Sequence, residues 1–283
     1  MAILDSVVEV LGGLASRAPA RAAVEAWWLV FTPVWMGLVG SLMISGVVER
    51  WGDVPCMTLG VGLGAGALVT PVVWPHASER ATPWWDRTAF KCGLAVFLLA
   101  LGTNYTQAPF FFDVLHMHYG FQTTWNIDRT PIFLHFLSCA YFSTYFALCA
   151  MTFRWLRSTS LPSVLAWVVA PLAMAFLETA LNANPFIETL FCYDDLFFVL
   201  WFGTLAYGMV FMLALPGWMA IDEVPGRRAT WWNVGAWTLA ALYLDLVALD
   251  VVRYHVAPAL TEVVPDAPGL RDVETSCLEP IRG

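Results

Sequence analysis

The stretch PLAMAFLETALNANPF, residues 171–186, decides how the rest of the chain is interpreted. It is an apolar run typical of a membrane-spanning helix, and it carries a carboxyl group, Glu178, within the run. A charged side chain at the centre of a bilayer costs about 2.5–3.5 kcal/mol, so such residues are rare and mark functional sites. Glu178 and Asn182 are four residues apart and share one helical face. The pair is therefore either a structural link between two helices or a polar group that faces a substrate.

The composition predicts a membrane protein built as one helical bundle. Of the 283 residues, 59% are hydrophobic and 13% are charged, whereas a soluble domain carries about 25% charged residues. A bilayer-spanning helix needs about 20 apolar residues. Seven runs reach that length, at approximately 27–48, 55–75, 89–112, 131–153, 162–184, 195–219 and 232–256. We therefore predict an all-α polytopic membrane bundle of seven transmembrane helices.

The same runs divide the chain into three parts. Residues 1–26 form a weakly amphipathic lead, residues 27–257 form the membrane domain, and residues 258–283 form a tail rich in prolines and acids. We expect the tail to be poorly ordered, because it shows no hydrophobic periodicity. The second apolar run carries Gly60, Gly62, Gly64 and Gly66. Small residues at this spacing let two helices approach closely in lipid.

The distribution of basic residues predicts the orientation of the bundle. Nine basic residues lie on the side of the N-terminus, whereas Arg50 and Arg129 are the two in the short connections on the other side. Because cytoplasmic loops carry the excess of Lys and Arg, the N-terminus is predicted to be cytoplasmic. The chain is expected in a bacterial inner membrane or in the endoplasmic reticulum, according to its source. The nine are Arg17, Arg21, Arg80, Arg87, Lys91, Arg154, Arg157, Arg227 and Arg228.

Several functions are excluded or disfavoured by what the chain lacks. A retinal-binding rhodopsin needs a lysine in the last helix, and the one lysine, Lys91, lies near the start of the third run. The net charge is −8 and no basic patch is present, so nucleic acid is not an expected partner. His116 and His118 have no clustered third ligand, so no metal site is predicted. The sequence predicts no particular oligomeric state.

Polar side chains from separate runs are predicted to lie at one depth of the membrane, in its non-cytoplasmic half. Because intramembrane polar groups face the bundle interior, they are expected to share one polar chamber. The loops 113–130 and 185–194 would cover that side. The residues concerned are Asn104, Tyr105, His135, Glu178, Asn182, Asp245 and Asp250.

Each of these groups also has a structural interpretation. His135 could be a hydrogen-bonded core residue or a catalyst. Asp250 and Arg253 are three residues apart, a geometry suited to an ion pair. Asp245 has no cation three or four residues away and could be a buried acid or a structural hydrogen-bonding group. The basic and acidic residues at the foot of the third run, Asp86 to Lys91, are expected to be solvated or to set the topology.

The same residues resemble cycloeucalenol cycloisomerase, the cyclopropyl sterol isomerase family of plants. The similarity covers approximately residues 27–257 and includes the blocks Asn104-Tyr105 and Phe176-Leu177-Glu178-Thr179. Further matching positions are Asp86, Arg87, Lys91, Phe111, Phe112, Val114, Leu115, Tyr119, Phe121, Trp125, Pro131, Arg154, Leu156, Arg157, Asn184, Asp222, Glu223, Leu249, Asp250 and Arg253. The family pattern has histidines where this chain has Pro109, Cys139 and Phe146.

The resemblance implies a membrane enzyme that opens the 9,19-cyclopropane ring of a sterol to give a Δ8 alkene without a redox cofactor. The reaction needs a desolvated acid, a base and aromatic faces that stabilise a cation. Glu178 is then the proton donor or the carboxylate paired with the cation, and Asp245 or His135 completes the relay. The expected substrate-binding residues are Asn104, Tyr105, Tyr119, Phe121, Phe176, Asn182, Asn184 and Asp250.

Two other functions use the same scaffold. The first is a non-catalytic membrane protein that binds sterols or other lipids, which the replaced histidines favour. The second is a sterol isomerase that shifts a double bond with the same acid and base. In all three cases the expected partners are a sterol or similar lipid and the bilayer itself.

Overall fold

The structure, a computed structural model of the chain, describes residues 2–193 and 195–258. Seven helical stretches in this part are long and apolar enough to cross a membrane. They confirm the predicted all-α polytopic bundle and identify an integral membrane protein. Beyond its first residue, the predicted tail 258–283 lies outside the described residues. The spans are Pro19–Ile44, Asp53–Val73, Thr88–Asp113, Ile132–Ser158, Ser163–Asn182, Leu196–Ala220 and Trp231–Val256.

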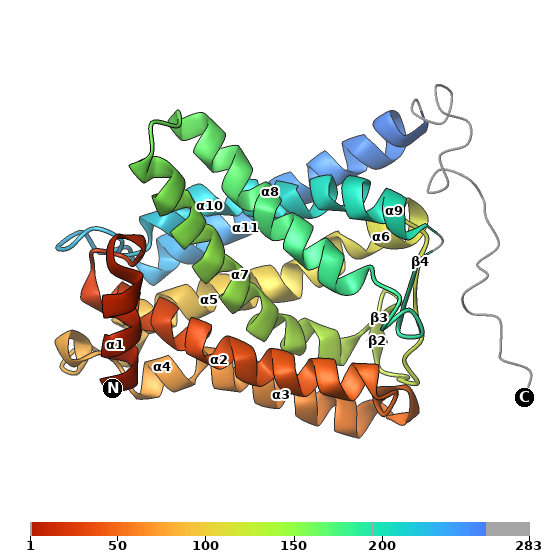
Figure 1. Cartoon of the computed structure of the whole chain (residues 1–283), viewed down its shortest axis with the longest axis horizontal. Coiled ribbons are helices and arrows are strands. Elements are labelled where there is room, and N and C mark those ends of the chain that lie inside the picture. Colours follow the sequence, from red (N-terminus) through yellow and green to blue (C-terminus); the bar gives the residue numbers. More distant parts are fainter. Residues whose placement is uncertain (1, 194, 259–283) are drawn as a thin grey trace, which may run out of the picture.

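The helices lie side by side, with the short strands gathered at one end of the bundle (Figure 1). The first half of the chain forms α1 (Ala2–Leu11), α2 (Pro19–Ile44), α3 (Asp53–Leu68), α4 (Thr70–Val73), α5 (Thr88–Thr106) and α6 (Ala108–Asp113). The second half forms α7 (Ile132–Ser158), α8 (Ser163–Asn182), α9 (Leu196–Phe198), α10 (Thr204–Ala220) and α11 (Trp231–Val251). The strands are β1 (Met117–Tyr119), β2 (Asn126–Ile127), β3 (Thr130–Pro131) and β4 (Phe191–Tyr193). Short 3-10 turns lie at Gly12–Leu14, Val48–Arg50, Ala77–Glu79 and Trp84–Asp86, and π-helical turns η5 and η6 at Val199–Gly203 and Val252–Val256.

The first span begins earlier than the sequence predicted. It starts at Pro19, so residues 19–26 belong to α2 and the lead is reduced to α1 and its connection. The added segment contains two charged residues, Arg21 and Glu25. In the structure the Arg21 Nε lies 2.8 Å from the Glu25 Oε1, and both side chains are buried. Pairing therefore allows two ionic residues inside the first span.

Helix α7 lies at the centre of the bundle and packs closely on α3. Of the apolar window of α7, 72% is buried, the largest share among the seven spans. A Cβ atom on Gly60 or on Gly64 would lie 2.5 Å from a backbone oxygen of α7, Phe133 O or Phe136 O. A Cβ on Gly62 would meet no atom within 4 Å. The predicted close packing is confirmed at Gly60 and Gly64, because only a hydrogen fits there.

A buried ionic network ties the helices together at the end that holds the N-terminus. The Arg154 guanidinium bonds to Glu25 of α2 and to Glu223 after α10, at 2.7–2.9 Å. Lys91 is fully buried, with its Nζ 2.5 Å from the Asp222 Oδ2. The expectation of a solvated Lys91 was wrong, because Asp222 supplies the partner that burial of an ammonium group requires.

The opposite end is covered by paired loop segments. β1 pairs antiparallel with β4, with Met117 opposite Tyr193, and β2 pairs with β3. The loop 113–130 and the described part of the second loop, 185–193, therefore cover this end of the bundle. Gly120 is required here, because a Cβ would lie 1.8 Å from the Thr189 carbonyl oxygen. Arg253 pairs with Asp113 rather than with Asp250, so the predicted helix-internal pair was wrong.

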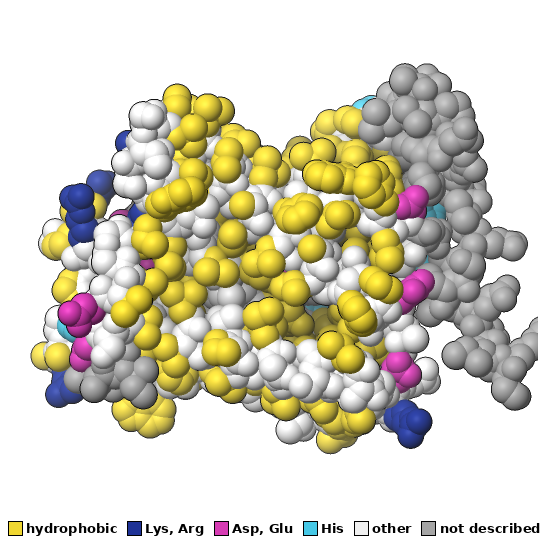
Figure 2. Space-filling view, in the orientation of Figure 1, with side chains coloured by type: hydrophobic (Ala, Val, Ile, Leu, Met, Phe, Trp, Pro, Cys, Tyr) yellow, Lys and Arg dark blue, Asp and Glu magenta, His cyan; other side chains and the backbone are white. Residues whose placement is uncertain are grey.

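The surface has the distribution of side chains that a bilayer requires. On the face drawn in Figure 2, hydrophobic side chains cover the middle, and the acidic and basic side chains gather at the two ends of the bundle. A band of apolar side chains between two charged rims matches the hydrocarbon core between two headgroup regions.

Candidate functional site

Glu178 lies near the C-terminal end of α8, and one oxygen of its carboxyl group accepts a hydrogen bond. The Asn182 Nδ2 donates to the Glu178 Oε1 at 3.0 Å and to the Glu178 backbone oxygen at 3.1 Å. The predicted shared face is thus confirmed. The other carboxyl oxygen, Oε2, is buried and has no hydrogen-bond partner. A carboxyl group with one anchored oxygen and one unpartnered oxygen is oriented and still able to engage a further group.

Several tyrosine side chains interact with this carboxyl group. Five of the eight tyrosines in the chain interact electrostatically with Glu178. The Tyr145 hydroxyl lies close to the carboxyl group and is itself buried, yet outside hydrogen-bonding geometry. A buried acid within a shell of phenol groups has both proton carriers and aromatic faces near it. The five are Tyr119 of β1, Tyr141 and Tyr145 of α7, Tyr193 of β4 and Tyr207 of α10.

The remaining three tyrosines point away from the interior. The exposed fractions of Tyr105, Tyr243 and Tyr254 are 57%, 66% and 59%. Tyr105 was predicted to bind substrate beside Asn104. In the structure the two side chains diverge, because neighbouring residues on a helix point in different directions: Asn104 bonds to Ser138 of α7, whereas Tyr105 lies on the surface. The tyrosines therefore divide into an interior group around Glu178 and a peripheral group.

The two strand tyrosines close the site from the loop side. Burial, together with the nearby Glu178 carboxyl group, raises the pKa of Tyr119, and burial likewise raises the pKa of Tyr193. Both phenols are therefore neutral hydrogen-bond donors at physiological pH. Phe121 packs beside them, with its ring centroid 5.9 Å from that of Tyr119. Tyr119 and Phe121, which the sequence placed at the site, thus form part of its aromatic cover.

Asn104 and His135 form a second polar cluster, between α5 and α7. The Asn104 Nδ2 donates to the Ser138 Oγ at 2.8 Å and to the Ala100 oxygen at 2.7 Å. The His135 Nδ1 lies 3.3 Å from the Leu101 oxygen, and its Nε2 is buried without a partner. Both side chains link the two helices, which matches the structural interpretation of His135.

Asp245 belongs to a third polar cluster, between α5 and α11. Its side chain is fully buried, and its Oδ2 accepts a hydrogen bond of 3.1 Å from the Gln107 Nε2. The Asp245 Oδ1 has no partner. Gln107 was not singled out from the sequence, although a second amide three residues after Asn104 inside an apolar run is a signal of interior packing.

The predicted polar residues therefore do not form one connected cluster; they form three separate clusters. Glu178, His135 and Asp245 each bond to a different partner, and no hydrogen bond or ion pair joins the three across residues 2–193 and 195–258. The physical reason is that each group has a partner nearby: Asn182 on the same helix for Glu178, the Leu101 carbonyl for His135 and the Gln107 amide for Asp245. Two neighbours of Glu178, Tyr141 and Asn182, line a groove of ligand size.

Three further predicted substrate-binding residues lie away from the Glu178 carboxyl group. Phe176 is 41% exposed and packs on Trp201, with ring centroids 6.0 Å apart. Two residues along a helix correspond to about 200°, so Phe176 lies on the face opposite Glu178. Asp250 is exposed near the end of α11. Asn184 caps the turn after α8, where its Oδ1 accepts from the Phe186 backbone nitrogen at 3.0 Å.

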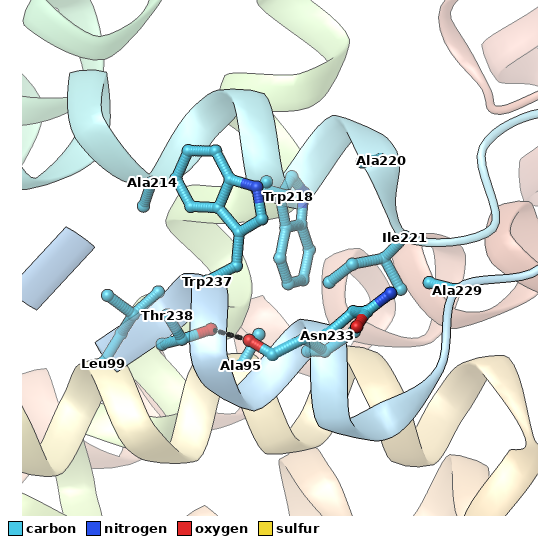
Figure 3. A pocket seen from close by; sticks show the side chains of 12 residues that line it. Ala95, Leu99, Ala214, Trp218, Ala220, Ile221, Ala229, Asn233, Trp237 and Thr238 are labelled. Carbon is cyan, nitrogen blue, oxygen red and sulfur yellow. Dashed lines mark hydrogen bonds between the residues drawn. The ribbon is translucent and has the colours of Figure 1, made fainter. Parts of the chain in front are cut away.

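The described residues form several cavities of different sizes. A small one of about 50 Å³ lies between α5, α10 and α11, and Trp218, Trp237 and Thr238 line it (Figure 3). It has room for water rather than for a lipid. An open apolar groove of about 780 Å³ lies between α8 and the segment from α9 to α10, on the side of Phe176. A groove of about 380 Å³ lies between α2 and α8, on the side of Asn182.

No group of three His, Cys, Asp or Glu side chains that could hold a metal ion occurs among the described residues. The functional groups at the site around Glu178 are therefore a carboxyl group, an amide and phenols. These groups can accept, hold and donate protons and can stabilise positive charge through aromatic faces.

The sequence pointed to Glu178 and Asn182 but missed most of the tyrosine shell. Tyr141 and Tyr145 are four residues apart on α7, and Tyr207 lies inside α10. Tyrosines in membrane proteins gather at the interfaces. A pair at helical spacing within a span was therefore a signal that these hydroxyls face other protein groups rather than lipid.

The chain was compared with protein-family models, with curated proteins and with solved structures, and none of them matches it.

Proposed function

We propose that this protein is a membrane isomerase that opens the 9,19-cyclopropane ring of a cyclopropyl sterol and yields a Δ8 sterol. The observation that supports it is the set of five tyrosines that interact electrostatically with the Glu178 carboxyl group, whose partner Asn182 lines a groove between α2 and α8. The sequence resemblance to the cyclopropyl sterol isomerases supplies the reaction.

The reaction consists of one proton addition and one proton loss. Glu178 donates a proton to the cyclopropyl methylene carbon, and the bond from that carbon to C9 breaks. The methylene becomes a methyl group, and a cation forms at C9. Loss of the proton at C8 then leaves the electron pair of that C–H bond as the C8–C9 double bond. Substrate and product are isomers, so the reaction involves no net oxidation or reduction and needs no electron carrier.

The surroundings of Glu178 suit both steps. A carboxylic acid kept out of water is retained in its neutral form and can donate a proton. Asn182 fixes the Oε1 at 3.0 Å and leaves the Oε2 without a partner. The rings of Tyr141, Tyr145 and Tyr207 can stabilise a cation that lies within about 6 Å of a ring face. The same carboxylate, or a phenol oxygen beside it, can accept the C8 proton.

The residues at the three family histidine positions favour an alternative. Phe146 is fully buried against Trp218, with ring centroids 4.8 Å apart, and Cys139 donates to the His135 backbone oxygen. Phenylalanine at 146 and proline at 109 supply no acid or base. If the family chemistry depends on those histidines, the protein binds a sterol or another lipid without converting it.

One experiment separates the candidate functions. The purified protein is supplied with a cyclopropyl sterol in mixed micelles, and the products are analysed by gas chromatography and mass spectrometry. The Δ8 sterol is the expected product. Binding of the sterol without any product selects the lipid-binding alternative. A shifted double bond from a sterol that has no cyclopropane ring selects a double-bond isomerase.

A further inference from the structure

The groove between α2 and α8 lies on the lipid-facing side of the bundle, close to the strands. Its volume is about 380 Å³, within the range of about 300–1,000 Å³ that is typical of small-molecule sites. The face drawn in Figure 2 is hollowed between these two helices. The groove is lined by Trp35, Met36, Val39, Gly40, Met43 and Ile44 of α2, by Tyr141 of α7, and by Ala180, Leu181, Asn182, Asn184, Phe186 and Ile187 of α8 and the following turn.

Two polar side chains join this groove to the Glu178 carboxyl group. Asn182 lines the groove and donates to the Glu178 Oε1 at 3.0 Å. Tyr141 also lines the groove and interacts electrostatically with Glu178. A molecule that lies in the groove therefore contacts the first neighbours of the carboxyl group.

Two other features near Glu178 differ from this groove. The paired strands β1 and β4 carry Tyr119 and Tyr193, which interact electrostatically with the carboxyl group. The larger groove, between α8 and α10, lies on the face of Phe176, about 200° around the helix from Glu178. It therefore approaches the back of α8 rather than its carboxyl face.

The lining of the α2–α8 groove indicates the chemistry of its occupant. Its walls are apolar along the C-terminal part of α2, and its amides, Asn182 and Asn184, lie at the end of α8 and in the following turn. Asn184 uses one N–H and one lone pair within its own turn, which leaves a donor and an acceptor for a hydroxyl group. Glu178 lies about one turn before the end of α8 at Asn182, and Asn184 follows that end by two residues. This order fits a rigid lipid whose hydroxyl lies at one end and whose reacting carbon lies in the middle of its ring system.

We infer that the α2–α8 groove is the site through which a fused-ring lipid alcohol enters from the membrane and in which it lies during the reaction. Its hydroxyl group contacts Asn184, and its rings extend along α2 toward Asn182 and Glu178. This inference rests on the proposed isomerase function, and it adds the binding site and the route from the bilayer.

Gly40 allows a direct test, because it faces empty space in the groove. A Cβ atom on Gly40 would meet no atom within 4 Å, and the same holds for Gly37 in the same helix. Gly40 lines the groove, whereas Gly37 is exposed and does not. A large side chain at position 40 therefore fills the groove without displacing the protein. The same side chain at position 37 points to lipid, and both replacements favour the helix over glycine.

The experiment compares Gly40→Trp with Gly37→Trp, and Gly40→Leu with Gly37→Leu as the smaller pair. The first readout is kcat/KM for a cyclopropyl sterol. Gly40→Trp is expected to lower it at least ~10-fold, the lower end of what one steric change in an apolar pocket gives. The second readout is photolabelling by a diazirine-bearing cholesterol, with labelled peptides identified by mass spectrometry. Labels are expected on α2 and α8 in the natural protein and in Gly37→Trp, and at least ~10-fold fewer labels are expected in Gly40→Trp.

The outcomes separate this inference from the proposed function. If the natural protein forms no product but Gly40→Trp alone loses the label, the isomerase proposal fails and the groove remains the lipid site. If both position-40 variants turn over and take up label as the natural protein does, the groove assignment is overturned and the isomerase proposal stands. Equal losses in the position-37 variants also overturn the groove assignment, because the effect then does not come from filling the groove.

Discussion

At the scale of single residues, the polar groups inside the membrane have different partners and therefore different roles. Glu178 is held by Asn182 and surrounded by phenols, whereas Asp245 is held by Gln107 of another helix. In the first arrangement, the partner Asn182 lines a groove of ligand size. The second lies fully inside the packing of α5 and α11. We therefore propose a chemical role for Glu178 and a role in helix association for Asp245.

The role of Asp245 can be tested by stability. Asp245→Ala removes the acceptor for the Gln107 amide, while Asp245→Asn keeps an oxygen at the same place. Hydrogen bonds between membrane helices contribute about 0.6 kcal/mol on average and up to about 1.7 kcal/mol. We expect Asp245→Ala to lower the free energy of unfolding by an amount in that range, and Asp245→Asn to recover most of it. Denaturation of the purified protein in mixed micelles measures both. Equal stability of all three proteins would show that this hydrogen bond does not hold α11 to α5.

The sequence was informative about which polar residues lie in the membrane but not about their grouping. Glu178 and Asn182 were paired correctly, because their contact lies within one helix and follows from its periodicity. The contacts of Asp245 and of Tyr207 cross between helices, and their geometry depends on how the helices rotate about their axes. A periodic pattern in one run does not determine that rotation, so the single predicted chamber was too large.

At the scale of helices, the packing of α3 on α7 depends on two glycines. A Cβ on Gly60 or Gly64 would meet a backbone oxygen at 2.5 Å, whereas one on Gly62 would meet nothing within 4 Å. Backbone atoms cannot move aside as a flexible side chain can. The two helices must therefore separate if either glycine is replaced.

These glycines provide a matched comparison. Gly60→Ala and Gly64→Ala are each expected to destabilise the protein by about 1–3 kcal/mol, the cost of overpacking a close contact. Gly62→Ala is the control in the same helix, and it should be neutral or slightly stabilising, since alanine favours the helix. Thermal unfolding in detergent, followed by circular dichroism, gives the ranking. A destabilisation by Gly62→Ala as large as that by Gly64→Ala would contradict this account of the α3–α7 contact.

At the scale of the whole molecule, charge and hydrophobicity predicted most of the architecture. The seven apolar runs are the seven spans, because the length of a span follows from the thickness of the bilayer. The first span begins eight residues earlier than predicted, and these residues include Arg21 and Glu25, which pair in the structure. The pairing of β1 with β4 could not be predicted from sequence patterns, because these strands are only three residues long and lie far apart in the chain.

The orientation of the protein in the membrane can be tested separately from its function. Because the basic residues favour the N-terminal side, the loop between α7 and α8 should be cytoplasmic and the β2 segment should face the other side. Single cysteines at exposed positions, Ser160→Cys and Asn126→Cys, report on the two sides when intact cells are treated with an impermeant thiol reagent. Label on Asn126→Cys alone, above the natural protein as background, is the expected result. Label on Ser160→Cys alone would reverse the orientation.

The central claim is that the Glu178 carboxyl group delivers the proton that opens the ring. The most direct measurement is the reaction in D₂O with a cyclopropyl sterol, in which mass spectrometry follows deuterium in the new methyl group. The natural protein and the control Glu9→Gln, an exposed carboxyl group on α1, should both give product with one deuterium in that methyl group. Glu178→Gln should form product at least about 100-fold more slowly, since a positioned acid typically contributes 10²–10⁴-fold. Deuterated product from Glu178→Gln at the rate of the natural protein would contradict the claim.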